Sequence, residues 1–329
     1  MNDHDDRSSL GLTRDGSRLH VCMGEICNNN CLFCMDQGGR VRQRHLELID
    51  RQQILGFLAQ NVALGEVLFT AGEPTLHPDL PILVREARKL GYRSIGVITN
   101  GRRMSYLAYT EGLLKAGLNH VVVSIHGHEA RLHDALTRTP GSFSQTVAGL
   151  RILSGLRGRY PLRLSTSTVV NRRNLPALRA IVDFLLSFDV DQVVLNAIQP
   201  LGRGDVLFDR LVPRYREIAD AVRGAVAGQG ERRGRVRLVD VPPCILLGIP
   251  EECRGWVEEH QHYERSPGLP AELGRPRSAP LQAPVQKRDF DAIQRAFGPP
   301  CEACPLRGGC DGVWKRYVRE HGWDEFGVP

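Results

Sequence analysis

Short apolar runs alternate with longer amphipathic stretches along the first two thirds of the chain. Runs of four to eight apolar residues, rich in Val, Ile and Leu, are typical of strands that are buried on both faces. Six such strands are predicted: Arg18–Met23, Glu66–Thr70, Ser94–Thr99, His120–Ile125, Leu162–Val170 and Gln192–Ile198.

Start and stop signals predict helices between these strands. Asp79 precedes one helix, with Pro81 in its first turn and Gly91 after its end, which are the expected boundary residues. Ser142 and Gln145 form a capping-box pattern at the start of another. Further helices are predicted over Gln52–Leu64, over Met104–Ala116, and from an Asn174 cap to Leu186.

This alternation predicts an α/β fold with a parallel sheet, either a (β/α) barrel or a doubly wound sheet. Eight units would complete a TIM barrel, but the pattern stops after six, near Pro200. Beyond residue 235 prolines become frequent, and a Pro- and Arg-rich loop is predicted at about 264–286. We therefore expect a polar leader over 1–17, a core over 18–235 and a small irregular, cysteine-rich extension over 236–329.

Composition narrows the classes of protein that fit. Of the 329 residues, 42% are hydrophobic and 24% charged, as in ordinary globular proteins. No stretch approaches the roughly 18 apolar residues of a membrane span, and the first residues are too polar for a secretory signal. Nine cysteines without an export signal indicate metal binding in a reducing cytoplasm. The net charge of +6 comes from scattered arginines without an aromatic-rich RNA-binding signature, which argues against a nucleic-acid partner.

Three cysteines follow the first predicted strand in the spacing C-x3-C-x2-C: Cys27, Cys31 and Cys34. Three thiolates on so short a loop suit three corners of a cubane iron–sulfur cluster, which four cysteines usually close. Cys22 is expected to stay in the strand, so one iron would be open to a substrate or cofactor. Zinc sites prefer four closed ligands, and disulfides prefer small secreted chains, so neither alternative explains this spacing as well.

This cysteine loop resembles the signature of the radical S-adenosylmethionine (radical SAM) enzymes, C-x3-C-x-aromatic-C, with Phe33 as the aromatic residue. The resemblance implies a 4Fe–4S cluster whose open iron chelates SAM. It also implies cleavage of SAM to a 5′-deoxyadenosyl radical that abstracts hydrogen from a substrate. The family's fold is a partial, open (β/α)6 TIM-like barrel, and a small reductant protein such as flavodoxin or ferredoxin supplies its electron.

The segment after the second strand resembles the family's glycine-glycine-glutamate-proline motif. Gly72, Glu73 and Pro74 match it, and Ala71 replaces the first glycine. In the family this segment binds the amino group of SAM through backbone carbonyls and the glutamate. A plain turn at a strand end is the alternative.

Further SAM contacts are expected at other strand ends, where (β/α) barrels gather their functional groups. Ser124, Asn171 and Asn196 are candidates for the ribose, adenine or carboxylate, and Arg138 is a fork-shaped donor for the SAM carboxylate. Each has an alternative as a turn or strand-end residue. His126 is the one loop histidine that lies close enough to a strand end to be kept as a candidate.

A second cysteine group lies near the end of the chain, in the spacing C-x2-C-x5-C: Cys301, Cys304 and Cys310. It resembles a truncated SPASM or twitch extension, which implies an auxiliary 4Fe–4S cluster. A fourth thiolate is needed, and Cys244 is preferred to Cys253. A zinc knot with the same ligands is the alternative.

The function predicted from these features is a cytoplasmic radical SAM enzyme. Its substrate is expected to be a peptide or a small molecule, in peptide maturation or in natural-product or cofactor biosynthesis. About twenty residues precede the first strand, too few for a leader-binding domain, so recognition of a peptide leader would need another protein. The alternative is a non-enzymatic iron–sulfur or zinc protein that binds nucleic acid.

Overall fold

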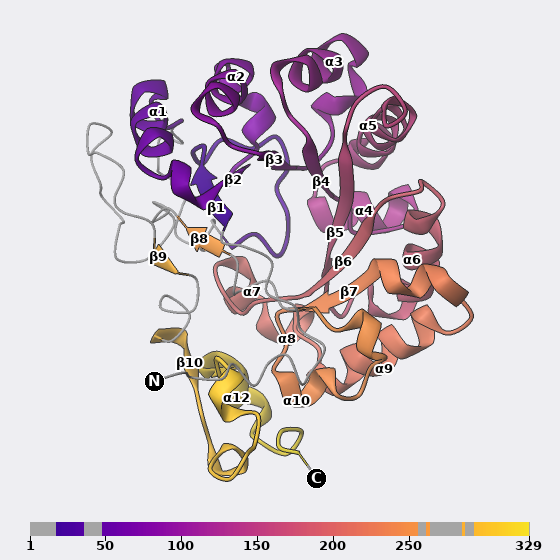
Figure 1. Ribbon diagram of the computed structural model, residues 1–329. Coiled ribbons are helices and arrows are strands. Elements are labelled where there is room, and N and C mark those ends of the chain that lie inside the picture. The colour runs from indigo at the N-terminus through magenta and orange to yellow at the C-terminus, as the bar shows by residue number, and fades with distance from the viewer. Residues whose placement is uncertain (1–17, 36–47, 256–260, 264–284, 287–292, 329) are drawn as a thin grey trace.

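The computed structural model describes residues 18–35, 48–255, 261–263, 285–286 and 293–328. Seven parallel strands follow one another around a curved sheet in chain order (Figure 1). They are β1 (Arg18–Cys22), β2 (Glu66–Thr70), β3 (Ser94–Thr99), β4 (His120–Ser124), β5 (Arg163–Val170), β6 (Gln192–Ala197) and β7 (Val236–Val239). β8 (Gln261–Tyr263) pairs in parallel with the free edge of β1, and β9 (Val285–Gln286) pairs antiparallel with β8.

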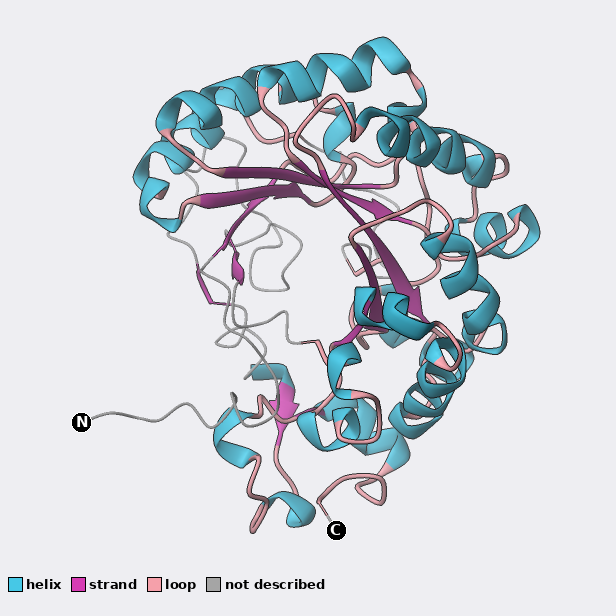
Figure 2. Cartoon of the chain, turned by 45° about the vertical axis from the view of Figure 1, so that its right-hand side comes forward, coloured by secondary structure: helices cyan, strands magenta, loops and turns pink. Residues whose placement is uncertain are grey.

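Helices connect the strands and cover the outer face of this sheet, while its inner face encloses the centre (Figure 2). The helices of the described residues, including those of the C-terminal region, are in chain order α1 (Arg51–Gln60), α2 (Leu80–Leu90), α3 (Leu107–Ala116), α4 (Ala130–Thr137), α5 (Ser142–Leu156), α6 (Leu178–Leu186), α7 (Arg203–Val206), α8 (Phe208–Leu211), α9 (Tyr215–Val226), α10 (Pro243–Leu246) and α12 (Lys315–His321). The fold is the predicted α/β class, a partial TIM-like barrel, and the doubly wound sheet is excluded because the strand order is consecutive.

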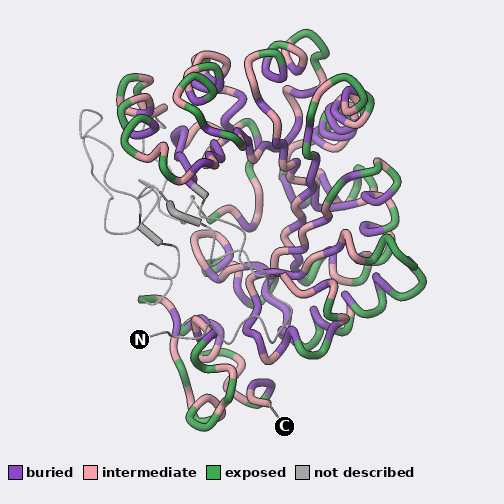
Figure 3. Tube along the Cα trace, viewed as in Figure 1, coloured by how far each residue is buried: buried purple, intermediate pink, exposed green. Residues whose placement is uncertain are grey.

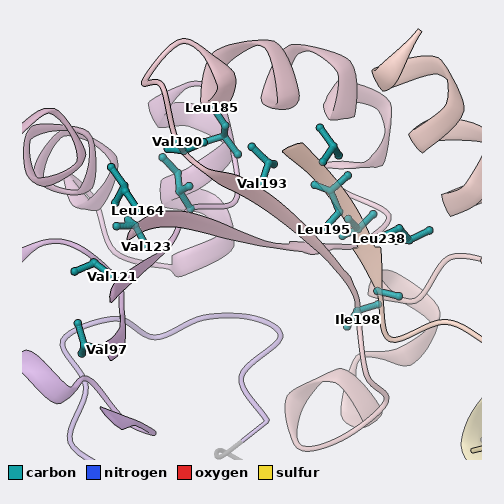
Figure 4. Close-up of a cluster of buried hydrophobic side chains, with 14 of the residues drawn as sticks. Val97, Val121, Val123, Leu164, Leu185, Val190, Val193, Leu195, Ile198 and Leu238 are labelled. Carbon is teal, nitrogen blue, oxygen red and sulfur yellow. The ribbon is translucent and has the colours of Figure 1, made fainter. Parts of the chain in front are cut away.

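Side chains alternate between the two faces of the strands, as the period of two requires. The outward positions, such as Val123 and Leu195, are fully buried against the helices. Leu185 of α6 lies beside Val190 and Val193 in this layer (Figure 4), and the buried runs follow the strands in Figure 3. The inward positions at the ends of β4 and β6 are only half-buried, so they face an accessible interior.

The sheet has two parallel strands beyond the predicted six, β7 and the short β8. β7 pairs with β6 from Val193↔Val236 to Asn196↔Val239. Its four residues, three apolar and one arginine, follow an arginine-rich turn, Gly230–Arg235, and carry too weak a pattern to stand out as a strand. The predicted leader at 1–17 and most of the loop at about 264–286 lie outside the described residues.

Tertiary contacts replace several predicted helix caps. The capping box at Ser142 and Gln145 was wrong, because Asp134 at the end of α4 caps α5 instead. Its Oδ1 accepts from the backbone N–H of Phe143 at 2.7 Å and from the Ser142 hydroxyl at 2.9 Å. The Gln145 side chain accepts from Arg102 instead.

Three predicted helices differ from the structure near their starts or ends. The helix predicted over Gln52–Leu64 ends at Gln60, and a 3-10 turn follows. The helix predicted from Met104 begins at Leu107 after another such turn. Asn174 does not cap α6, because its Oδ1 accepts from the backbone N–H of Asn171 at 2.8 Å.

The C-terminal region packs on the last barrel helix. β10 (Arg295–Ala296) pairs antiparallel with β11 (Val313–Trp314), and α12 follows. The Tyr317 ring stacks on Tyr215 of α9 at 4.3 Å, and its hydroxyl accepts from the Tyr215 backbone N–H at 2.9 Å. Tyr317 also donates to the buried carboxylate of Glu325, which accepts from the Arg216 backbone N–H at 2.9 Å. These buried polar bonds fix the extension against the barrel.

None of the helices in the described part of the chain is long and apolar enough to span a membrane.

Candidate active site

The three cysteines of the first motif lie on the loop after β1, at the carboxyl edge of the sheet. Cys22 stays in β1 and is 3% exposed, as expected. Burial raises the pKa of the Cys31 thiol to about 12, and negative charge on Cys34 and Cys27 adds to the rise. Cys27 and Cys34 therefore both lie within electrostatic reach of Cys31. The backbone N–H of Asn29 donates to Cys27 Sγ at 3.4 Å.

The backbone of this cysteine loop, residues 27–34, is paired with the end of α4. The N–H of Asn30 donates to the Thr137 carbonyl, and the N–H of Leu32 donates to the Leu136 carbonyl, both at 2.9 Å. Arg138 follows directly, exposed and in the left-handed conformation with φ 52°. The predicted carboxylate-binding arginine is thus brought next to the cysteine loop in space.

The turn after β2 contacts the chain just before Cys27. Ala71 and Gly72 both have positive φ, 63° and 54°. A Cβ atom at Gly72 would lie 2.6 Å from the Ile26 carbonyl oxygen, so only glycine allows this approach. The Glu73 backbone N–H then donates to the same carbonyl at 2.7 Å. The motif therefore supports the cysteine loop through its main chain.

The carboxylate of Glu73 is fully buried and bonded inside the protein. Oε1 accepts from the Thr75 hydroxyl and the Thr99 hydroxyl, each at 2.6 Å, and from the Thr75 backbone N–H at 3.0 Å. Oε2 accepts from the Asn100 backbone N–H at 2.7 Å. Burial raises the pKa of Glu73, and these hydrogen bonds oppose the rise. The side chain links the ends of β2 and β3, which leaves the main-chain carbonyls of the motif as acceptors for an ammonium. Pro74 is buried in the 3-10 turn that begins here.

The turn after β3 supplies contacts that the sequence did not reveal. Asn100 Nδ2 donates to Asn28 Oδ1 at 2.6 Å. Arg102 Nη1 donates to the Asn28 carbonyl oxygen and, at 3.0 Å, to Asn29 Oδ1. The position of Asn100 and Gly101 at the carboxyl end of a predicted strand was the signal that could have identified them.

Two of the predicted strand-end residues share the inner face of the sheet. Ser124 is in register with Ser167, and Asn196 Nδ2 donates to Ser167 Oγ at 2.9 Å. Asn171 differs, because it is buried and its side chain is bonded locally. Its Nδ2 donates to the Val169 carbonyl at 2.9 Å, and its Oδ1 accepts from the Arg173 backbone N–H at 3.0 Å. Ser124 and Asn196 therefore face the barrel interior together, and Asn171 is held in a turn.

His126 packs behind the motif's aromatic residue. Its ring meets Phe33 edge-on at 4.6 Å between centroids, and its Nδ1 accepts from the Val169 backbone N–H at 3.2 Å. Burial, with a smaller effect of the neighbouring His133, lowers the pKa of His126 well below its ordinary value. The His126 imidazole is therefore neutral and packs against the Phe33 ring.

The C-terminal cysteines converge with Cys244. Burial raises the pKa of Cys244, and negative charge on Cys304 and Cys301 adds to it. Burial also raises the pKa of Cys310 to about 12, with a contribution from Cys244. Cys301, Cys304 and Cys310 thus all lie within electrostatic reach of Cys244.

Cys253 lies elsewhere. Its thiol is buried and donates to the Arg233 carbonyl at 3.4 Å. Burial raises its pKa to about 11, and its charged neighbours are Glu252, Arg237 and Arg233. No other cysteine is among these neighbours, so Cys253 stands apart from the four-thiol group.

Both cysteine groups offer the donors that iron–sulfur clusters use, because cysteine thiolates hold most such clusters. In the described residues, no group of three or more His, Cys, Asp or Glu side chains is arranged to hold one metal ion.

The chain is similar in sequence to known proteins. A family model described as the Radical SAM superfamily matches residues 21–185. Curated relatives include a "Probable GTP 3',8-cyclase" of Saccharolobus islandicus, 30% identical over 192 residues, and one of Sulfurisphaera tokodaii, 30% identical over 195 residues. Each match covers 58% of this chain and 59% of the relative, so the chain spans little more than half the length of these relatives.

Solved structures share the fold over most of the chain. Streptococcus suis SuiB bound to S-adenosylmethionine has a TM-score of 0.63 at 14% identity, covering 98% of this chain and 79% of SuiB. Native anSMEcpe with bound AdoMet has a TM-score of 0.58 at 14% identity, covering 92% of this chain and 90% of that one. At such identity these similarities establish the fold.

Proposed function

The chain belongs to the radical SAM superfamily, and we propose that it cleaves SAM reductively at a 4Fe–4S cluster held by Cys27, Cys31 and Cys34. One observation carries the proposal: three cysteines lie on a single loop at the carboxyl edge of a (β/α) barrel, within the matched segment, and the Cys31 thiol interacts with the other two. Membership of an enzyme superfamily favours this function over a non-enzymatic protein that binds nucleic acid.

The protein's own groups provide binding and orientation. When bound, the cluster supplies the electron that cleaves the sulfonium of SAM and so yields the radical that abstracts hydrogen from the substrate. Carbonyls of the Gly72–Pro74 turn would accept from the ammonium of SAM, and Arg138 would donate to its carboxylate. Ser124 and Asn196, on the inner face, would bond the ribose or adenine, with Asn171 as a weaker candidate because its side chain is bonded locally.

The four C-terminal thiols are proposed to hold an auxiliary 4Fe–4S cluster. Cys244, Cys301, Cys304 and Cys310 supply the usual four ligands, which leaves no iron open. The proposal is supported by the electrostatic coupling of Cys244 to the other three thiols.

The domain organisation is proposed in a slightly changed form. The barrel core begins at residue 18, as predicted, and we extend it from residue 235 through β7 because that strand pairs with β6. The extension then begins after Val239 and carries all four auxiliary ligands. A cytoplasmic location and a flavodoxin or ferredoxin reductant remain proposals from the sequence.

A peptide is the substrate class we propose first. Structures whose fold covers nearly all of this chain include SuiB bound to its precursor peptide SuiA and anSMEcpe bound to a peptide. A nucleotide is the second candidate, because the curated relatives are named probable GTP 3',8-cyclases, although their match covers only 58% of this chain.

The test is anaerobic reconstitution and reduction, followed by quantification of 5′-deoxyadenosine and methionine. The wild type should form both from SAM, and the variant with Cys27, Cys31 and Cys34 all replaced by Ala should form neither while remaining folded. Wild-type amounts of 5′-deoxyadenosine from that variant would refute the function. Candidate substrates are then added to the wild type. Short peptides encoded beside the gene should raise the yield of 5′-deoxyadenosine if the substrate is a peptide, and GTP should raise it if the substrate is a nucleotide.

A further inference from the structure

Arg203 binds the cysteine loop at three points. Its Nη1 donates to the carbonyl oxygens of Asn30 at 3.0 Å and Cys31 at 2.8 Å. Its backbone N–H donates to the Cys34 carbonyl oxygen at 3.0 Å. One residue, the first of α7, therefore holds the main chain between the second and third cysteines. It lies outside the segment that the family model matches, 21–185.

The residue before it makes this contact possible. Gly202 has φ 54°, and a Cβ atom there would lie 2.3 Å from the Met35 carbonyl oxygen and 2.6 Å from that of Cys34. Any larger residue would push α7 away from the loop. The close approach is thus built into the backbone and does not depend on one flexible side chain.

The other side of α7 is fixed by the C-terminal extension. Arg316 of α12 donates from Nε to Asp205 Oδ1 at 2.7 Å, and its guanidinium lies 4.6 Å from the centre of the Phe208 ring. Arg203 is therefore held between the cysteine loop and a packed helix pair. Such support on both sides is what keeps a residue in one geometry.

In the described part of the chain, the Arg203 guanidinium binds peptide carbonyls and forms no ion pair, whereas the Arg316 charge is paired with Asp205. Reduction of a cluster adds one negative charge. An uncompensated cation beside a partly buried site stabilises that added charge.

We propose that Arg203 is a positioning residue that fixes the cysteine loop and makes the cluster held by Cys27, Cys31 and Cys34 easier to reduce. The inference rests on the proposed function, because it requires that cluster. It gives the segment after β6 a role that follows neither from the cysteine spacing nor from the segment that the family model matches.

The experiment is a redox titration of the reconstituted full-length protein, followed by electron paramagnetic resonance (EPR). The cluster concerned is identified by the change in its signal when SAM is added, and the titration is run without SAM. Arg203→Gln should lower the ratio of reduced to oxidised cluster about tenfold at a fixed potential, which is a shift of about 59 mV to more negative potential. Arg203→Lys should keep most of the wild-type reduction potential. Arg210→Gln, which removes a neighbouring exposed arginine in α8, should leave the potential unchanged.

An Arg203→Gln protein with full iron content and the wild-type potential would overturn the proposal. If Arg203→Gln fails to take up iron while Arg210→Gln takes it up fully, the positioning role is supported. The iron content of Arg203→Lys then shows whether a positive charge alone restores cluster assembly. A wild type without any SAM-sensitive cluster signal would instead refute the proposed function itself.

Discussion

The two cysteine groups of this protein are assembled in opposite ways. Cys27, Cys31 and Cys34 lie within eight residues on one loop, and the surrounding barrel loops hold that loop by its backbone. The C-terminal group joins Cys244 of α10 to a motif that begins 57 residues later, at Cys301. The first group has three interacting thiols and the second has four.

This difference in number separates two kinds of chemistry. Three thiolates leave one iron of a cubane without a protein ligand, and that iron can bind a cofactor. Four thiolates close the cluster and leave it to structural support or electron transfer. The barrel supports the open site with groups from β2, β3, α4 and α7, as a site that must hold a ligand requires.

The largest expected effect concerns the fourth ligand of the second group. In the variant that lacks Cys27, Cys31 and Cys34, Cys244→Ala should remove most of the remaining iron, about four atoms per chain. Cys253→Ala is the matched control and should retain it, because that thiol is bonded to the Arg233 carbonyl and not to the group. Iron and zinc are counted by elemental analysis. One zinc and no iron in the parent variant would replace the cluster with a zinc knot.

A methyl group at Gly72 should disturb the first group. Gly72→Ala places a Cβ atom against the Ile26 carbonyl and imposes a positive φ on alanine, which should cost about 1–3 kcal/mol of unfolding free energy and weaken iron retention. Gly112→Ala in α3 meets nothing within 4 Å and should be neutral or stabilising by up to about 1 kcal/mol. Chemical denaturation measures both, and equal stabilities would contradict the close approach.

Glu73→Gln tests the buried link between β2 and β3. An amide in place of the carboxylate must turn an N–H group toward the Asn100 backbone N–H or toward the Thr75 and Thr99 donors, which should cost about 1–3 kcal/mol. Affinity for SAM should fall as well, through displacement of the neighbouring turn. Unchanged stability combined with lost SAM affinity would show that the carboxylate contacts the ligand directly.

The smallest effect is expected at Ala71. Its φ of 63° is unfavourable for alanine, and Ala71→Gly would relieve that strain at an entropic cost in the unfolded chain. The net gain should stay below about 1 kcal/mol, visible as a small rise in the denaturation midpoint. A clear loss of stability would mean that the Ala71 methyl group contributes packing that outweighs the strain.

The sequence predicted the strands and the cysteine motif, because a few neighbouring residues determine each of them. The apolar runs located β1 to β6, and the spacing of three cysteines identified the family, because both signals lie within a few residues. β7 escaped notice because four residues carry little periodicity. The α5 cap was wrong because Asp134, eight residues before Ser142, supplies it.

Contacts made across the fold could not be predicted from the sequence. Arg203 lies 173 residues from Asn30 and 172 from Cys31 along the chain, and nothing in the local sequence distinguishes it from other arginines. Cys244 was preferred to Cys253 from the sequence, but only the fold shows that its thiol interacts with Cys301, Cys304 and Cys310. The hydrogen bonds by which Glu73 links β2 to β3 also join distant parts of the chain, and its contact with SAM stays a prediction.

The most direct test of the contrast between the two groups is EPR of the reduced protein with and without SAM. The wild type should show a cluster signal that changes when SAM is added. The variant that lacks Cys27, Cys31 and Cys34 should keep the signal of the auxiliary cluster, and SAM should leave that signal unchanged. A SAM-induced change in that variant, or none in the wild type, would contradict the assignment of an open site to the three-cysteine loop and a closed site to the four-thiol group.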